Sequence, residues 1–187
     1  LVAMVAKAAG GKVTISEINE NRLALAETLG FETINPTAVD AVAEVMKKTG
    51  DKGADVIFEV SGVQPAVDLM TAVGATRARI VMVAIHAKKP QIDLFRFFWR
   101  ELKMIGTRVY EPEDYTKAIA AIAAGEIDAD AMITDVTPLA RIDQVRAGGP
   151  TDRAPGTVGP QHGVEVRDGR ALAVGAGDDD RRVVVLG

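Results

Sequence analysis

The 187-residue sequence contains no cysteine. This absence excludes disulfides, a thiol nucleophile and a cysteine-based zinc site within these residues, and it fits the reducing cytoplasm in which we expect the protein to work. The sequence also lacks a large excess of charge of either sign, because its formal net charge is only −4. We therefore expect no nucleic acid and no membrane surface as partners. No apolar run reaches the roughly 18 residues of a membrane span.

The beginning of the sequence lacks an initiating methionine and the basic start of a signal peptide. Residues 1–9 are apolar all round, which is typical of a buried helix, and Gly10 and Gly11 are suited to ending it. Because the chain opens inside such an element, we expect the domain to be truncated at its N-terminus.

Apolar strand-like segments alternate with helix-like segments along most of the chain. Strands are predicted at residues 13–18, 31–35, 54–60, 79–85, 103–109 and 131–136, and helices at 20–29, 39–48, 65–73 and 112–124. The run ADVIFEV is apolar except for Glu59, which is typical of a strand buried on both faces of a parallel sheet. The alternation predicts an α/β fold with a doubly wound parallel sheet.

The strand at residues 13–18 reaches an acidic residue, Glu17, close to its end. In doubly wound folds, ligands bind beyond the carboxyl ends of the strands, where an acid can accept both ribose hydroxyls of an adenosine. Such an acid repels a 2′-phosphate and so favours NAD over NADP. In dinucleotide-binding folds the glycine-rich phosphate loop lies about 20 residues before this acid. Counted back from Glu17, that position falls before Leu1. Two alternatives stay open: a surface carboxylate, or a methyltransferase that binds the ribose of S-adenosylmethionine.

Four stretches of the sequence together resemble the cofactor domain of medium-chain, zinc-dependent alcohol dehydrogenases, especially the butanediol and sorbitol dehydrogenases. They are GGKVTISEINENRLALAETLGFETINP, GADVIFEVSGVQPAV, RIVMVAIHAKKPQIDL and LKMIGTRVYEPEDYTKAIAAIAAGEIDADAMITDVTPLARIDQV. The resemblance covers residues 1–145 and implies a Rossmann-like NAD-binding domain. It also implies hydride transfer between a secondary alcohol or diol and NAD, a small-molecule alcohol substrate and a homo-oligomer.

The same resemblance implies a cofactor site, carried over position by position. Its expected residues are Glu17 and Arg22 at the adenosine ribose, Ser61 and Gly62 beneath the adenosine, Val83 and Ile85 against the nicotinamide, and Thr107 and Arg108 at the carboxamide. Val109, next in line, is expected to pack within a strand. His86, which follows the nicotinamide strand, is expected to be solvated, with a role near the cofactor as the alternative. The aromatic residues between positions 95 and 99 are expected to pack against a neighbouring domain or subunit.

The family's catalytic zinc is bound by an N-terminal domain that is not found in these residues. Zinc is therefore expected only in that domain, and no catalytic or metal-binding residue is predicted in this chain. Two alternative functions stay open: a truncated, non-catalytic fragment, or a zinc-independent domain like that of NADPH-dependent quinone reductases. Glu17 argues against the second, because its charge disfavours a 2′-phosphate.

Residues 146–187 differ from the rest, since they hold half of the 18 glycines and read as irregular until the final RVVVLG. A local frameshift would explain this tail. In the family the first strand is central in the order 3-2-1-4-5-6, and its loss would leave backbone groups of two inner strands unpaired. One hypothesis is that the chain alone folds poorly or associates. The other is that residues 182–187 fill the central position.

Overall fold

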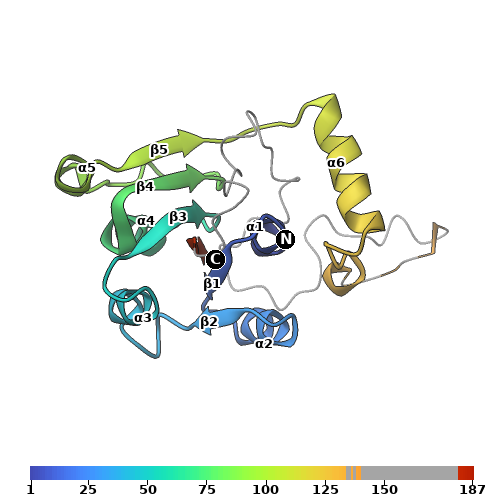
Figure 1. Ribbon diagram of the computed structural model, residues 1–187, viewed down its shortest axis with the longest axis horizontal. Coiled ribbons are helices and arrows are strands. Elements are labelled where there is room, and N and C mark those ends of the chain that lie inside the picture. Colours follow the sequence, from blue (N-terminus) through green and yellow to red (C-terminus); the bar gives the residue numbers. More distant parts are fainter. Residues whose placement is uncertain (134–135, 137, 140–180) are drawn as a thin grey trace.

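The computed structural model describes residues 1–133, 136, 138–139 and 181–187, whose helices and strands alternate along the chain (Figure 1). Its helices are α1 (Val2–Ala8), α2 (Glu20–Thr28), α3 (Ala41–Lys48), α4 (Gln64–Val73), α5 (Leu94–Arg100), α6 (Pro112–Ala123) and the short 3₁₀ helix η1 (Asp130–Met132). Its strands are β1 (Lys12–Ser16), β2 (Glu32–Ile34), β3 (Ala54–Glu59), β4 (Gly74–Met82), β5 (Lys103–Gly106) and β6 (Arg182–Leu186).

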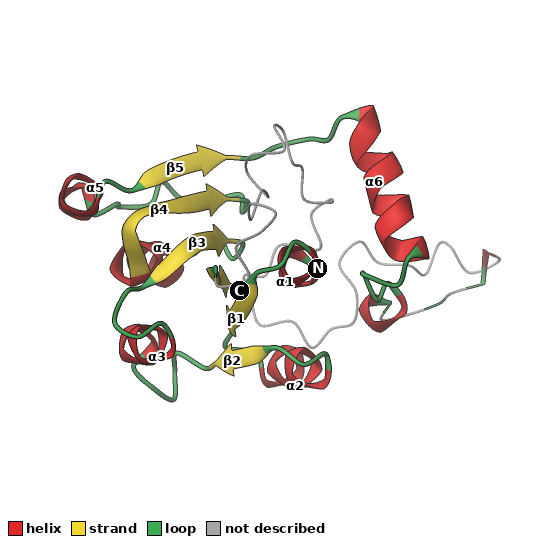
Figure 2. Ribbon diagram, in the orientation of Figure 1, coloured by secondary structure: helices red, strands yellow, loops and turns green. Residues whose placement is uncertain are grey.

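All of these strands form one parallel sheet in the order β2-β1-β6-β3-β4-β5 (Figure 2). This is the order 3-2-1-4-5-6 with β6 in the place of the first strand. Val183 of β6 lies opposite Val13 of β1 on one side and Val56 of β3 on the other. The hypothesis that residues 182–187 fill the central position is therefore confirmed, and the inner edges of β1 and β3 are both paired.

Side chains of β6 alternate between two apolar layers, as expected for a strand covered by helices on both faces. Val183 and Val185 join a cluster that includes residues of α1 and α2, whereas Val184 and Leu186 join a cluster with α3 and α4. All four are at most 5% exposed. The predicted doubly wound α/β fold is thereby confirmed.

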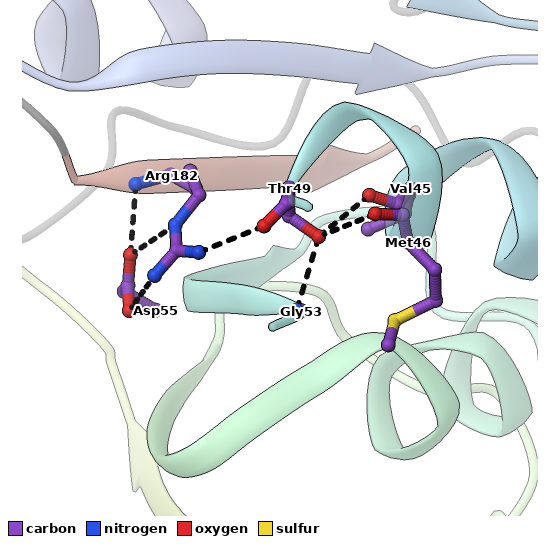
Figure 3. A network of polar contacts seen from close by, with 6 residues as sticks. All are labelled: Val45, Met46, Thr49, Gly53, Asp55 and Arg182. Atoms are coloured by element: carbon purple, nitrogen blue, oxygen red, sulfur yellow. Dashed lines mark hydrogen bonds and ion pairs between the residues drawn. The ribbon is translucent and has the colours of Figure 1, made fainter. Parts of the chain in front are cut away.

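The amino end of β6 is fixed by a polar network (Figure 3). The Arg182 guanidinium donates from Nε and Nη2 to the two carboxylate oxygens of Asp55, each at 3.0 Å, and its backbone N–H donates to the same carboxylate at 2.9 Å. Arg182 Nη1 also donates to the carbonyl of Thr49 at 3.0 Å, and the Thr49 hydroxyl accepts from the Gly53 amide. The clamp joins β6 to β3 and to the end of α3, and so fixes the register of the central strand.

Several predicted boundaries differ from the observed ones. Residues 130–132 form a 3₁₀ helix rather than the start of a strand, because Asp128 accepts the amide of Ala131 and turns the chain. Helix α5 was not predicted, since its aromatic residues show no apolar period, although Asp93 caps it by accepting the Arg96 amide. Strand β4 begins at Gly74, before the predicted residue 79. The domain boundary expected near residue 145 lies outside the described residues.

Candidate cofactor-binding edge of the sheet

The expected cofactor residues lie at the ends of strands or just beyond them. Because every pairing in the sheet is parallel, the carboxyl ends of β1, β3, β4, β5 and β6 meet at one edge. Glu17 follows β1, the Ser61–Gly62 turn follows β3, Val83 follows β4 and Thr107 follows β5. The fold thus brings residues far apart in the sequence to the edge where doubly wound sheets bind ligands.

Glu17 is held in place by its own turn. Its Oε1 accepts the backbone amides of Ile18 and Asn19, each at 2.9 Å, and its Oε2 accepts Arg22 Nη1 at 3.0 Å. Only 7% of the Glu17 side chain is exposed, compared with 54% of the Arg22 side chain. Asn19 also caps α2 by accepting the Arg22 amide at 3.1 Å. The carboxylate is therefore fixed, while its guanidinium partner reaches solvent.

The end of β6 lies directly against this carboxylate. The Gly187 amide donates to the Ser16 carbonyl at 2.8 Å, and a Cβ atom built on Gly187 would lie only 2.9 Å from Glu17 Oε2. A side chain at this position would have to displace the carboxylate. Glu17 therefore faces the end of the central strand, which neighbours the crevice where the strand order of a doubly wound sheet reverses.

The turn after β3 is built on a second carboxylate, Glu59, which is 0% exposed. Its Oε1 accepts the amides of Ser61 and Gly62 at 3.0 and 2.8 Å and the Ser61 hydroxyl at 2.6 Å. Gly62 has φ +75°, and a Cβ there would lie 2.8 Å from the Ile85 carbonyl oxygen, so the turn requires glycine. The Ser61 hydroxyl is thus used within the turn.

The loop after β4 packs on this turn. The amides of Val83 and Ala84 both donate to the Glu59 carbonyl, at 2.9 and 3.1 Å. The Ile85 side chain is 72% exposed and free to contact a ligand. His86 was expected to be solvated, and this expectation is wrong: its side chain is 13% exposed because it lies over the buried Glu59, with Nε2 3.4 Å from Oε2.

The segment after β5 extends beyond the sheet. The Thr107 amide and hydroxyl both donate to the Met82 carbonyl at 3.1 Å, and the Arg108 that follows is exposed. The expectation that Val109 packs in a strand is wrong, because β5 ends at Gly106 and the side chain is 54% exposed. Val109 also has φ +55°, which costs a branched residue about 1–2 kcal/mol. The chain is therefore strained next to the segment expected at the carboxamide.

Sequence reasoning placed Glu17 at this edge but assigned no role to Glu59, and it did not anticipate that Gly187 lies against Glu17. Glu59 was visible only as one acid in an apolar run, and such an interruption is itself a signal, because a buried carboxylate needs hydrogen-bond donors. The described residues contain no cluster of three or more histidine, cysteine or acidic side chains placed to hold a metal ion. In the same part of the chain, no helix combines the length and apolar character needed to cross a bilayer.

An ion pair with altered pKa values lies away from this edge. Arg77 Nε donates to Glu101 at 2.8 Å, just before the residues through which β4 and β5 pair. This hydrogen bond raises the pKa of Arg77 and lowers the pKa of Glu101. Both groups are fully exposed, so the pair is surface chemistry and not part of the candidate site.

The fold and the site define a class of protein: a doubly wound parallel α/β domain with an acidic residue, Glu17, beside the central strand. Residues 1–124 match the family model described as zinc-binding dehydrogenase, and the chain belongs to this family. The resemblance stated from the sequence is thereby confirmed.

Individual relatives agree with this placement. The chain is 53% identical over 142 residues to the 2-dehydro-3-deoxy-L-galactonate 5-dehydrogenase of Pseudoalteromonas atlantica, a match covering 76% of this chain and 42% of that protein. It is 32% identical over 136 residues to the (R,R)-butanediol dehydrogenase of Neisseria gonorrhoeae, covering 72% and 38%. The chain thus spans about two fifths of the length of these curated relatives.

A solved structure shares the fold. It is a zinc-binding dehydrogenase from Sinorhizobium meliloti 1021 bound to NADP, with a TM-score of 0.59 and 22% sequence identity. The match covers 71% of this chain and 49% of that chain. At this identity the likeness supports the fold alone.

Proposed function

We propose that the carboxyl edge of the sheet binds NAD, and that the whole protein transfers hydride between a secondary alcohol or diol and NAD in the cytoplasm. Family membership supports dehydrogenase chemistry, and the names of the relatives indicate small hydroxylated substrates. The described residues hold and orient the dinucleotide, and the bound nicotinamide supplies the hydride chemistry.

The observation that carries the proposal is the position of Glu17. Its carboxylate is fixed by two backbone amides and lies against the end of the central strand. Oε1 already accepts two amides, whereas Oε2 accepts only Arg22 Nη1, so Oε2 can accept a ribose hydroxyl while keeping the contact it already makes. The exposed Arg22 can move away to admit the sugar without exposing a buried charge. These features fit an adenosine diol and disfavour a 2′-phosphate.

The remaining expected residues line the path from the adenosine to the nicotinamide. The Ser61–Gly62 turn follows β3 at the same edge, where the resemblance puts the adenosine. Val83 and the exposed Ile85 offer apolar contact for the nicotinamide ring. Thr107 and Arg108 lie one strand further on, where their backbone can contact the carboxamide. The proposal assigns binding roles, and not catalytic ones, to all of these residues.

Zinc does not fit the described residues, because they bring together no set of three ligating side chains. In the proposal, zinc and the alcohol are bound by the catalytic domain that members of the family carry. The described residues then contribute the geometry of the cofactor and not the chemistry at the substrate oxygen.

We also propose that the protein is a homo-oligomer. Strand β5 is the last strand of the sheet, and the neighbouring helix α5 exposes at least two thirds of four apolar side chains, Leu94, Phe95, Phe98 and Trp99. Large exposed apolar groups beside a sheet edge favour contact with another protein surface. Light scattering of the purified chain should therefore give a mass above that of one copy.

One specific observation favours NADP as the alternative cofactor. The Arg22 guanidinium lies 3.0 Å from Glu17 and is 54% exposed, so it could pair with a 2′-phosphate if the carboxylate were neutralised. This would correspond to a zinc-independent, NADPH-dependent reductase. The intact carboxylate disfavours it, because a phosphate and a carboxylate would compete for the same guanidinium.

The test is calorimetric titration of the full chain with NAD, NADP and S-adenosylmethionine. We expect NAD to bind most tightly and Glu17→Gln to weaken it about tenfold, since the carboxylate contacts to the ribose become neutral ones. Glu20→Gln is the matched control, because Glu20 lies on the same turn of chain but hydrogen-bonds to Asn35. Its NAD affinity should stay within about twofold of the unaltered chain.

Four outcomes would contradict the proposal. Tighter binding of NADP than of NAD would support the reductase alternative. Binding of S-adenosylmethionine alone would indicate a methyltransferase, and failure of the unaltered chain to bind any of the three would indicate a non-catalytic fragment. Equal loss of affinity in Glu17→Gln and Glu20→Gln would show that the effect is general charge and not ribose recognition.

A further inference from the structure

Two buried side-chain atoms in the described part of the chain have no hydrogen-bond partner: Glu59 Oε2 and His86 Nε2. They face each other at 3.4 Å. This distance lies just beyond the usual 2.7–3.2 Å of an N–H···O hydrogen bond, so a small movement of the His86 loop closes it. A carboxylate oxygen and an imidazole nitrogen in this position satisfy each other when the nitrogen carries a proton.

Glu59 holds the two sides of the candidate site together. Its Oε1 organises the Ser61–Gly62 turn, whereas its carbonyl accepts the amides of Val83 and Ala84 at the start of the next loop. The remaining oxygen, Oε2, is aimed at His86 on that same loop. One residue of β3 therefore contacts the turn expected beneath the adenosine and the loop expected at the nicotinamide.

The loop has a second attachment further along. The Gln64 side chain donates from Nε2 to the Gln91 carbonyl at 2.8 Å and accepts the Gln91 amide at 2.8 Å. Residues 83–93 contain no helix or strand, so these side-chain contacts substitute for regular pairing. The exposed Ile85 lies within the first attachment, between Ala84 and His86.

We propose that Glu59 and His86 are positioning residues of the cofactor site: the imidazole donates Nε2–H to the buried carboxylate and thereby holds Val83 and Ile85 at the nicotinamide half. This inference rests on the proposed NAD binding. It assigns the pair no contact with the reacting atoms. Because the pair fixes the loop that carries Val83 and Ile85, its loss should weaken contacts to the nicotinamide much more than contacts to the adenosine.

The first test observes the imidazole directly and needs no cofactor. The chain contains two histidines, so His162→Asn leaves His86 as a single set of signals in a long-range ¹H–¹⁵N spectrum. We expect Nε2 to be protonated and its signals to shift when Glu59 is replaced by glutamine. An unprotonated Nε2, or signals that are the same with Glu59→Gln, would overturn the inference.

The second test separates the two halves of the cofactor by comparing NAD with AMP, which lacks the nicotinamide. His86→Ala should weaken NAD about tenfold, since the loop must then be held in place over a buried carboxylate oxygen that has lost its donor. AMP should change by less than about twofold. His86→Gln, which keeps a donor of similar reach, should restore most of the NAD affinity.

The outcomes distinguish this inference from the proposed function. Unchanged NAD affinity in His86→Ala, or equal loss of NAD and AMP, overturns the positioning role alone. Failure of the unaltered chain to bind NAD overturns the proposed function itself. Should His86→Ala fail to fold, Gln64→Ala loosens the same loop from a half-buried position, and it too should weaken NAD while leaving AMP unchanged. If Gln64→Ala leaves the affinity for NAD unchanged, the inference is contradicted.

Discussion

The turns after β1 and β3 flank the end of β6 from opposite sides, and each is built on a buried glutamate. Glu17 and Glu59 are 5% and 0% exposed, and Oε1 of each accepts two backbone amides of the turn that follows. They differ at the second oxygen. Glu17 Oε2 pairs with Arg22, whose side chain is 54% exposed, whereas Glu59 Oε2 faces His86, whose side chain is 13% exposed.

This difference shows how one arrangement, a buried glutamate that accepts two amides of its own turn, can serve either ligand binding or positioning. A carboxylate whose partner reaches solvent can exchange that partner for a ligand, because the departing guanidinium is already half solvated and loses little by leaving. A carboxylate enclosed by a buried imidazole cannot, because removing either partner leaves a buried polar group unsatisfied. Glu17 is therefore suited to binding and Glu59 to positioning.

The largest effect should come from removing the strand that lies between the two turns. Deletion of residues 182–187 takes away four buried aliphatic side chains, which contribute about 6–12 kcal/mol at roughly 1.5–3 kcal/mol each. This is comparable to the whole stability of a domain, about 5–15 kcal/mol. We expect the deleted chain to lose its cooperative thermal transition, measured by circular dichroism, and to become sensitive to protease.

Arg182→Ala is the matched control for that deletion, since it keeps the strand and removes only the clamp to Asp55 and Thr49. It should lower the free energy of unfolding by about 1–2 kcal/mol, because the contacts are charge-assisted but about one quarter exposed. A deleted chain that unfolds as cooperatively as the intact one would show that β6 is dispensable, and the two turns would then be independent structures.

The next effect compares the two carboxylates directly. Glu59→Ala should destabilise the protein by about 3 kcal/mol, because it leaves two turn amides, a hydroxyl and His86 without their acceptor in a buried site. Glu17→Ala should cost only about 1 kcal/mol, since water can replace the carboxylate beside the exposed Arg22. Urea unfolding of both variants measures the difference. Equal losses would mean that Glu17 is as structural as Glu59.

The sequence allowed the first of these turns to be found but not the second. Glu17 follows an alternating strand and precedes a capped helix, so its place at the edge could be predicted from local pattern alone. The role of Glu59 depends on His86, 27 residues away, and on a loop without regular structure. No local periodicity encodes such a contact, and an acid inside ADVIFEV indicated only that something buried must satisfy it.

The same distinction applies to the fold. The alternation of strands and helices predicted a doubly wound sheet, because each element buries one or two faces that show in the pattern. RVVVLG is strand-like for the same reason, but its central position was only one of two hypotheses, since strand order depends on pairings across more than 120 residues. The Arg182–Asp55 contact is one such pairing. Helix α5 was missed because exposed aromatics obscure its period, leaving only the cap at Asp93.

The smallest effect should come from Arg22, the residue on which the comparison depends. Arg22→Ala should change the free energy of unfolding by less than about 1 kcal/mol, because half of the guanidinium is solvated and the pair with Glu17 is screened. The affinity for NAD should stay within about twofold, whereas any affinity for NADP should fall further, since a 2′-phosphate loses the guanidinium that pairs with Glu17. Calorimetry and urea unfolding measure both. Urea unfolding of Arg22→Ala and His86→Ala compares the two partners. Equal losses in the free energy of unfolding would mean that Arg22 encloses Glu17 as His86 encloses Glu59. The turn after β1 would then be closed to a ligand as well.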